Sequence, residues 1–204
     1  MKNGYVLVLV AALSVILTIS GCSKIRSWFK SDKKSPFDPK LAVVTVSSKD
    51  SRDSCYAVVY QEHPNDLVFM SVAHYFEKNP GPYHISLDYL KIKKVWRPDP
   101  KRDLVFFTVD RRTLTRGKDY EVPSFAVDIK AIDRLQFDIF NDELYRTEKR
   151  KLEHKEIESG EYLLSGIIEK GRSGSPVFVE GTDKCLGVVS GYYEDKRQTL
   201  ILAP

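Results

Sequence analysis

The chain of 204 residues is predicted to be an all-β protein made of two six-stranded antiparallel β-barrels. Three observations predict this class. From residue 41 onward, short runs rich in Val, Ile, Leu, Phe and Tyr recur at close spacing, and turn signals such as EHPND, NPGP and EGTDK separate them. No segment shows the periodicity of a long amphipathic helix. The composition, 42% hydrophobic and 29% charged, is typical of a globular protein.

The candidate strands follow one another with little between them. They cover residues 41–48, 54–61, 66–72, 83–96, 103–110, 124–129, 134–140, 144–157, 161–168, 175–180, 185–193 and 198–204. Residues 73–79 suit a single helical turn, and 144–157 alternates poorly for either strand or helix. The charged stretch 111–123 divides the strands into two sets of about six. We therefore expect an N-terminal barrel over 41–115 and a C-terminal barrel over 116–204.

The N-terminus predicts a leader segment. A short positive start precedes an apolar run from Tyr5 to Ile19, which is shorter than the ~20 residues of a membrane span and suits a secretory signal. The small residues before Cys22 resemble the bacterial lipobox. That resemblance implies a signal peptide over 1–21 and a diacylated Cys22, which would anchor the chain to a membrane. The alternatives are a plain signal peptide or an uncleaved anchor helix.

Residues 23–40 carry most of the positive charge. They hold six Lys or Arg and two Asp, a net +4 that equals the charge of the whole chain, so the part after residue 40 is nearly neutral. A nucleic-acid-binding domain would show a basic face on the fold itself. We expect no nucleic-acid partner. The segment 22–40, with lipidated Cys22, is expected to be a basic tether that lies against anionic lipid or is simply solvated.

The stretch EKGRSGSPVF at 169–178 is either an ordinary turn or a loop that presents a serine for chemistry. A serine nucleophile needs a histidine base held by a carboxylate. None of the four histidines follows Ser173, which excludes the order Ser, acid, His of α/β-hydrolases. Of these histidines, His63 and His84 suit surface positions and His154 suits a solvated one. No histidine has zinc-type spacing with cysteine, so no metal or cofactor is expected.

His74 and Asp103 are the candidate partners of Ser173. His74 follows the apolar run LVFMSV, so its side chain is expected at the end of a strand. Asp103 opens the run DLVFF after a polar turn, with Asp99 and Asp110 as rivals. The resulting order His, Asp, Ser is that of chymotrypsin-type enzymes.

Four stretches in this order resemble the trypsin/chymotrypsin-fold serine peptidase family. They are VAHY (72–75), DLVFF (103–107), GRSGSP (171–176) and CLGVVSGYY (185–193), which together span nearly all of 41–204. The resemblance implies two β-barrels with the active site in the cleft between them. It implies that Ser173, and not Ser175, attacks the substrate, that His74 is the base, and that Asp103 orients His74.

The same resemblance implies the binding elements. The amides of Gly171 and Ser173 would form the oxyanion hole, and Ser190, Gly191 and Tyr192 would line the substrate strand. The family's common Asp before the serine is Arg172 here, and Tyr75 stands where a cysteine often flanks the histidine. We therefore expect folding directly into an active form. Cys55 and Cys185 are expected either as a disulfide or as free buried thiols, with both alternatives open.

The sequence thus predicts a membrane-anchored serine endopeptidase that acts on a peptide or protein through an acyl-enzyme. The alternative is a catalytically inactive lipoprotein of the same fold that serves as a binding or scaffold module. The expected location is a bacterial cell envelope, at the outer membrane in a Gram-negative cell and otherwise at the outer face of the cell membrane. Nothing in the sequence sets the oligomeric state or the side chain preferred at the cleavage site.

Overall fold

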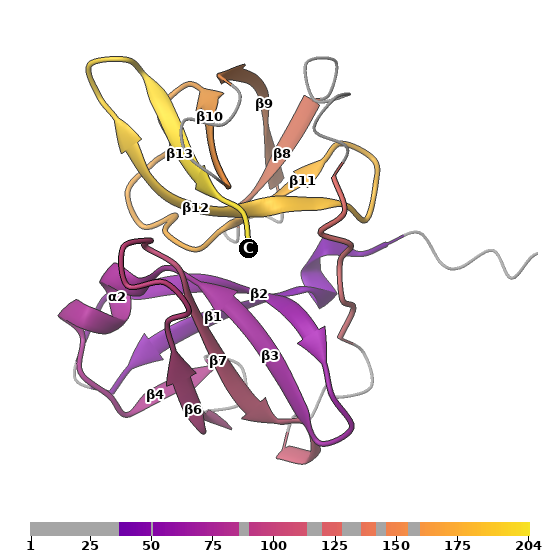
Figure 1. Ribbon diagram of the computed structural model, residues 1–204, viewed down its shortest axis with the longest axis vertical. Helices are drawn as coiled ribbons and strands as arrows, with labels where there is room; N and C mark the ends of the chain where they lie inside the picture. Colours follow the sequence, from indigo (N-terminus) through magenta and orange to yellow (C-terminus); the bar gives the residue numbers. More distant parts are fainter. Residues whose placement is uncertain are drawn as a thin grey trace, which may run out of the picture. The chain divides into compact units, whose positions relative to one another are not determined.

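Two antiparallel β-sheets form the protein, as the sequence predicts (Figure 1). The computed structural model describes residues 37–49, 51–85, 90–113, 120–127, 136–141, 146–154 and 160–204. The first sheet has seven strands in the order β5-β4-β1-β2-β3-β7-β6, and the second is a closed barrel in the order β10-β13-β12-β11-β8-β9. Residues 37–204 form one unit. The signal peptide and the tether predicted over 1–36 lie outside the described residues.

The elements of the first sheet lie between residues 39 and 113. They are η1 (Pro39–Leu41), β1 (Val43–Ser48), β2 (Ser54–Glu62), β3 (Asp66–Ser71), α2 (Ala73–Lys78), β4 (Tyr83–Ile85), β5 (Leu90–Lys91), β6 (Lys94–Trp96), β7 (Val105–Asp110) and η2 (Arg111–Thr113). The expected helical turn at 73–79 is present as α2. The sheet has seven strands and not six, because the run 83–96 is divided into three: β4 pairs with β1 and β5, whereas β6 pairs with β7.

The second barrel contains the remaining strands. They are β8 (Gln136–Asn141), β9 (Arg146–His154), β10 (Glu161–Ser165), β11 (Pro176–Val179), β12 (Cys185–Tyr193) and β13 (Gln198–Leu202). The ambiguous run 144–157 is a strand, β9, which pairs with both β8 and β10. The expected strand at 124–129 is wrong for the residues described there: Ser124 makes only an isolated bridge to Lys184, and its neighbours are irregular.

Strand β2 lies at the junction of the two sheets. Its residues Cys55 to Val59 are all at most 8% exposed, which is the continuous burial of a strand covered on both faces. Strand β2 contacts β1 and β3 of its own sheet and also β11 of the barrel. The buried cluster of the first sheet accordingly takes in residues of the barrel, among them Phe178 and Val188. A second cluster fills the barrel itself and includes Ile139 and Leu164.

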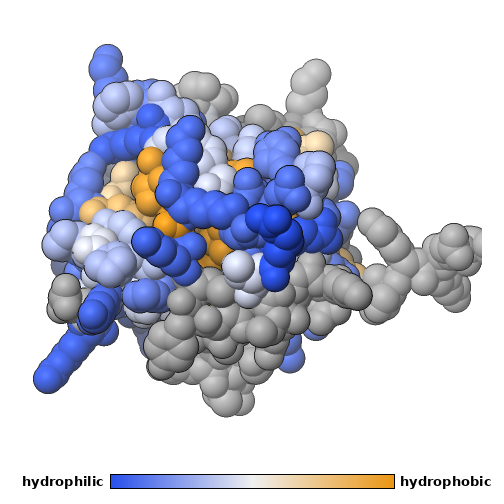
Figure 2. All heavy atoms as spheres, turned by 90° about the horizontal axis from the view of Figure 1, so that it is seen from below, coloured by the Kyte–Doolittle hydropathy of each residue, from blue (hydrophilic) through white to orange (hydrophobic). Residues whose placement is uncertain are grey.

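Seen from below the view of Figure 1, the molecule shows an apolar area near its centre, with hydrophilic residues along much of the rim of that area (Figure 2). The order of the seven strands ends in two edges, β5 and β6, whereas the barrel closes on itself. Among the described residues, no helix is long and apolar enough to span a bilayer.

Both cysteines of the described region are free and buried. Burial raises the pKa of each thiol to about 12. The Cys55 thiol lies 3.5 Å from the hydroxyl of Ser71, and that of Cys185 lies 3.4 Å from the carbonyl of Gly187. Of the two alternatives left open by the sequence, the structure has the free thiols.

Candidate active site

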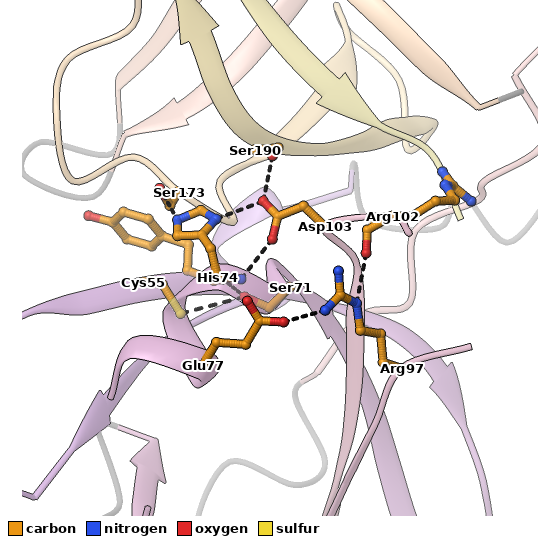
Figure 3. A network of polar contacts seen from close by, with 10 residues as sticks. Cys55, Ser71, His74, Glu77, Arg97, Arg102, Asp103, Ser173 and Ser190 are labelled. Carbon is orange, nitrogen blue, oxygen red and sulfur yellow. Dashed lines mark hydrogen bonds and ion pairs between the residues drawn. The ribbon is translucent and has the colours of Figure 1, made fainter. Parts of the chain in front are cut away.

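His74 lies at the first turn of α2, directly after β3. Val72 is still extended, and Ala73 is buried where the chain turns from the strand into the helix. The turn leaves the imidazole half-buried at the end of the sheet. The backbone N–H of His74 donates to Asp103 Oδ1 at 2.7 Å, and its Nδ1 lies 2.7 Å from Asp103 Oδ2 (Figure 3). The same carboxylate therefore holds both the main chain and the ring of His74.

Asp103 lies in the loop before β7, two residues from the start of the strand, and its carboxylate accepts a third hydrogen bond. The hydroxyl of Ser190 donates to Asp103 Oδ2 at 2.5 Å. Burial alone would raise the pKa of Asp103, but the hydrogen bonds from His74 and Ser190 outweigh it, and the pKa is lowered. The carboxylate is thus ionised at neutral pH. An ionised carboxylate only accepts, so we assign a proton to Nδ1 of His74, which leaves Nε2 as an acceptor.

Ser173 completes a chain of three side chains. Its Oγ lies 3.2 Å from His74 Nε2, within reach for a nucleophile and its base (Figure 3). The loop that carries it, between β10 and β11, is fixed by its backbone. The Ser173 carbonyl accepts from the N–H of Tyr56 at 2.8 Å, and the N–H of Gly174 donates to Val189 at 2.7 Å. Both neighbouring strands, β2 and β12, therefore hold the position of the serine.

The two glycines that flank Ser173 differ in their surroundings. Gly171 has φ +86°, and nothing lies within 4 Å of the place where a Cβ would be. Gly174 has φ +81°, but a Cβ there would lie 1.9 Å from the Tyr56 carbonyl oxygen. Both positions need a backbone conformation that favours glycine. Gly171 leaves its side of the loop open, whereas Gly174 allows the loop to pass directly over β2.

Arg172, directly before Ser173 in this loop, is buried and contacts β2. It is only 6% exposed, and its guanidinium donates to the Tyr56 hydroxyl at 3.3 Å and to Glu169 at 3.4 Å. A buried guanidinium needs such partners, because burial removes its hydrating water and only hydrogen bonds within the protein can compensate for that loss. Arg172, which stands where the family that the sequence resembles commonly has Asp, therefore ties the serine loop to Tyr56 of β2.

The predicted substrate strand is the second half of β12. The ladder of β12 with β11 runs only from Cys185 to Val188, so Ser190, Gly191 and Tyr192 lie beyond it and pair with β13 alone or not at all. The register with β13 shifts between Val189 and Gly191, which makes Ser190 the residue of a bulge. Bulges redirect side chains, and this one accompanies the contact of Ser190 with Asp103. Tyr192 and Tyr193 are 37% and 40% exposed.

The rival residues lie elsewhere. Asp99 accepts from the N–H of Lys101 at 2.9 Å within its own turn. Asp110 is the last residue of β7, at the end far from Asp103, and forms ion pairs with Lys93 and Arg112 at 3.1 and 2.8 Å. Ser175 is completely buried. His63 is exposed in the turn between β2 and β3, His84 lies in β4, and His154 ends β9. The structure brings together His74, Asp103 and Ser173.

Two contacts around these residues were not predicted from the sequence. Ser190 was expected only along the substrate strand, yet it also holds Asp103. Glu77 and Arg97, which form an ion pair beside His74, were not singled out at all. Their sequence surroundings are those of ordinary polar surface residues, so no local pattern marks them. Among the residues described, no group of three His, Cys, Asp or Glu side chains gathers as a metal site would require.

No family model matches the chain, and no curated protein matches its sequence. Solved structures do match it. A mutant of human heparin binding protein superimposes with a TM-score of 0.58 at 13% identity, over 82% of this chain and 89% of that one. The active form of the Rv3671c protease from M. tuberculosis gives 0.57 at 16% identity, over 81% and 77%.

A viral protein is similar as well. The catalytically active tobacco etch virus protease, solved with its product, gives a TM-score of 0.54 at 13% identity, over 84% of this chain and 77% of that one. Identities this low show the fold and not the activity. The chain has the two-barrel fold of trypsin-like proteases.

Proposed function

We propose that the protein is a serine endopeptidase that hydrolyses peptide bonds through an acyl-enzyme. The observation that carries this proposal is the unbroken chain from Ser173 Oγ to His74 Nε2, 3.2 Å, and from His74 Nδ1 to Asp103 Oδ2, 2.7 Å. A surface histidine would rarely have both a carboxylate and a serine hydroxyl aligned on its two nitrogens. The lowered pKa of Asp103 supports the tautomer that this chemistry needs.

The reaction would proceed in two halves. Ser173 Oγ attacks the substrate carbonyl carbon while its proton passes to His74 Nε2, and Asp103 stabilises the imidazolium. The tetrahedral intermediate collapses, the C–N bond breaks, and the leaving amine takes the proton from Nε2. Water then attacks the acyl carbon while His74 Nε2 takes its proton. The ester bond to Ser173 Oγ breaks, Oγ takes that proton back from Nε2, and the carboxylic acid product leaves. The amides of Gly171 and Ser173 would stabilise the oxyanion, and such donors are each worth about 10²–10³ in rate.

A fluorophosphonate probe tests the nucleophile. We expect stoichiometric labelling of the full chain, complete loss of labelling in Ser173→Ala, and loss in His74→Ala, because Ser173 depends on its base. Ser175→Ala is the matched control, since Ser175 is two residues away and buried, and it should still be labelled. Mass spectrometry of the labelled peptide reads the site. Absence of Ser173-dependent labelling would favour the inactive binding module instead.

We also propose that Cys22 carries lipid and anchors the protein in a bacterial cell envelope. The proposal is supported by the apolar run from Tyr5 to Ile19, by the small residues before Cys22 and by the basic segment after it. Two acyl chains suffice for stable anchoring, whereas one is marginal. Cys22→Ala should therefore move the protein from the membrane pellet to the supernatant on fractionation. Cys185→Ala serves as control, and an unchanged pellet fraction for Cys22→Ala would contradict lipid anchoring.

A further inference from the structure

The loop between β6 and β7 carries Asp103 and is held from two sides. On one side, the N–H of Ala73 donates to the Asp103 carbonyl at 3.3 Å, next to the contacts that His74 makes with the carboxylate. On the other side, the guanidinium of Arg102 donates to the carbonyls of Gly160 and Ala203, which belong to the second barrel. The position of the carboxylate thus depends on how this loop is tied to its neighbours.

Arg97 makes the contact that links this loop to the histidine helix. Its Nε donates to the carbonyl of Arg102 at 2.9 Å, and its Nη1 pairs with Oε1 of Glu77 (Figure 3). Arg102 immediately precedes Asp103, and Glu77 lies three residues after His74, on the same face of α2. A single guanidinium therefore touches the chain neighbour of the acid and the helix neighbour of the base.

The chemistry of this contact favours a geometric role over a role in stability. The side chains of Arg97 and Glu77 are 28% and 60% exposed, and ion pairs this accessible contribute little to the free energy of unfolding. A planar guanidinium, however, presents donors in a fixed fork, so it fixes the distance between its two acceptors. Lysine offers a point charge on a flexible stem and cannot fix both at once.

We propose that Arg97 is a positioning residue that keeps Asp103 in register with His74, with Glu77 as its anchor on α2. The kinetic part of this proposal rests on the proposed peptidase activity. A second readout does not: the proton between His74 Nδ1 and Asp103 gives a far-downfield proton NMR resonance only while the two groups stay in line. That signal can be recorded on the full chain whether or not Ser173 reacts.

The test compares Arg97→Ala with Arg112→Ala. Arg112 is the matched control because it holds Asp110 in a bidentate contact, at 3.0 and 2.8 Å. Asp110 is the last residue of β7, roughly 20 Å along the strand from Asp103. We expect Arg97→Ala to lower the limiting rate of fluorophosphonate labelling about 10-fold with the half-saturating probe concentration unchanged within about 2-fold, since small misplacements of a catalytic group act on the chemical step. Arg97→Lys should recover part of the rate, and Arg112→Ala should behave as wild type.

Glu77→Ala keeps the test valid if Arg97→Ala does not fold, because Glu77 is largely exposed. It should lower the limiting rate about 3-fold, as expected for the loss of one of two contacts. The downfield resonance should broaden or vanish in Arg97→Ala and persist in Arg112→Ala. Equal limiting rates and equal resonances in the Arg97, Glu77 and Arg112 variants would overturn the positioning role.

Failure of the two proposals is distinguishable. If wild type is not labelled but the resonance is lost only in Arg97→Ala, the peptidase proposal fails and the positioning role stands. If wild type is labelled and Arg97→Ala matches Arg112→Ala in both readouts, the peptidase proposal stands and the positioning role is overturned.

Discussion

Asp103→Asn is expected to lower the rate of Ser173 labelling by about 10⁴-fold while leaving the fold intact. The backbone N–H of His74 needs an acceptor on residue 103, so the asparagine oxygen takes the place of Oδ1 and its NH₂ group faces His74 Nδ1. The ring must then accept at Nδ1 and carry its proton on Nε2, where it cannot take the proton of Ser173. Labelling kinetics measure the effect, with circular dichroism as the check on folding.

The matched variant is Asp99→Asn, four residues earlier in the same loop, which removes the same charge outside the site. It should label at the wild-type rate. A similar loss in both variants would mean that loop structure, and not the tautomer of His74, determines the rate.

Asp103→Asn also has an expected pH signature. Because the folded state lowers the pKa of Asp103, this carboxylate contributes stability above its unfolded pKa, and the contribution is lost as the pH falls through the folded pKa. The difference in free energy of unfolding between wild type and Asp103→Asn should therefore be greater at pH 7 than at pH 3. Urea unfolding at the two pH values measures it, and a difference that grows toward acid would contradict the assigned direction.

Gly174→Ala is expected to destabilise the protein by about 3 kcal/mol or more. The new Cβ would lie 1.9 Å from the Tyr56 carbonyl oxygen and 2.9 Å from Ser71 Oγ, on a backbone with φ +81°. Either β2 or the serine loop must move, and the hydrogen bond from Tyr56 to Ser173 goes with it. The melting temperature should fall by about 10 °C, and labelling of Ser173 should be lost even where the protein remains folded.

Gly181→Ala is the control that separates the steric clash of a Cβ at Gly174 from the cost of a positive φ for alanine. Gly181 also has a positive φ, +70°, but nothing lies within 4 Å of its Cβ position. It should cost only about 1 kcal/mol, the strain of the left-handed conformation. Equal losses of stability in the two variants would show that the approach of Gly174 to β2 is not close.

The local sequence predicted the residues that have a distinctive chemical role. It did not predict the contacts that depend on how the strands pair and pack. His74, Asp103 and Ser173 could be found because a nucleophile requires a base and an acid in a recognisable order. The contact of Ser190 with Asp103 depends on a bulge in β12, which arises from the register with β13 and leaves no mark in either strand alone. The division of 83–96 into three strands likewise depends on pairing with β1 and β7.

The contact of Arg97 with Glu77 likewise could not be predicted from the local sequence, because the two residues lie far apart in the chain. Glu77 and Arg97 are 20 residues apart, and each is a common charged residue in a polar segment. Their partnership follows only once α2 and the loop before β7 are packed on the same end of the sheet. The seven-strand first sheet and the single bridge at Ser124 have the same origin, since in both cases tertiary pairing overrides local β-propensity.

The core that crosses from one sheet to the other has a consequence for folding. Phe178, Val188 and Leu202 of the barrel are buried in the same apolar cluster as the strands of the first sheet. If either half unfolded, the apolar residues that the other half buries against it would become exposed to water. The two halves should thus melt as one cooperative unit. Either half produced alone would expose this apolar surface and would show a broad thermal unfolding transition, as a subunit of an obligate dimer does without its partner.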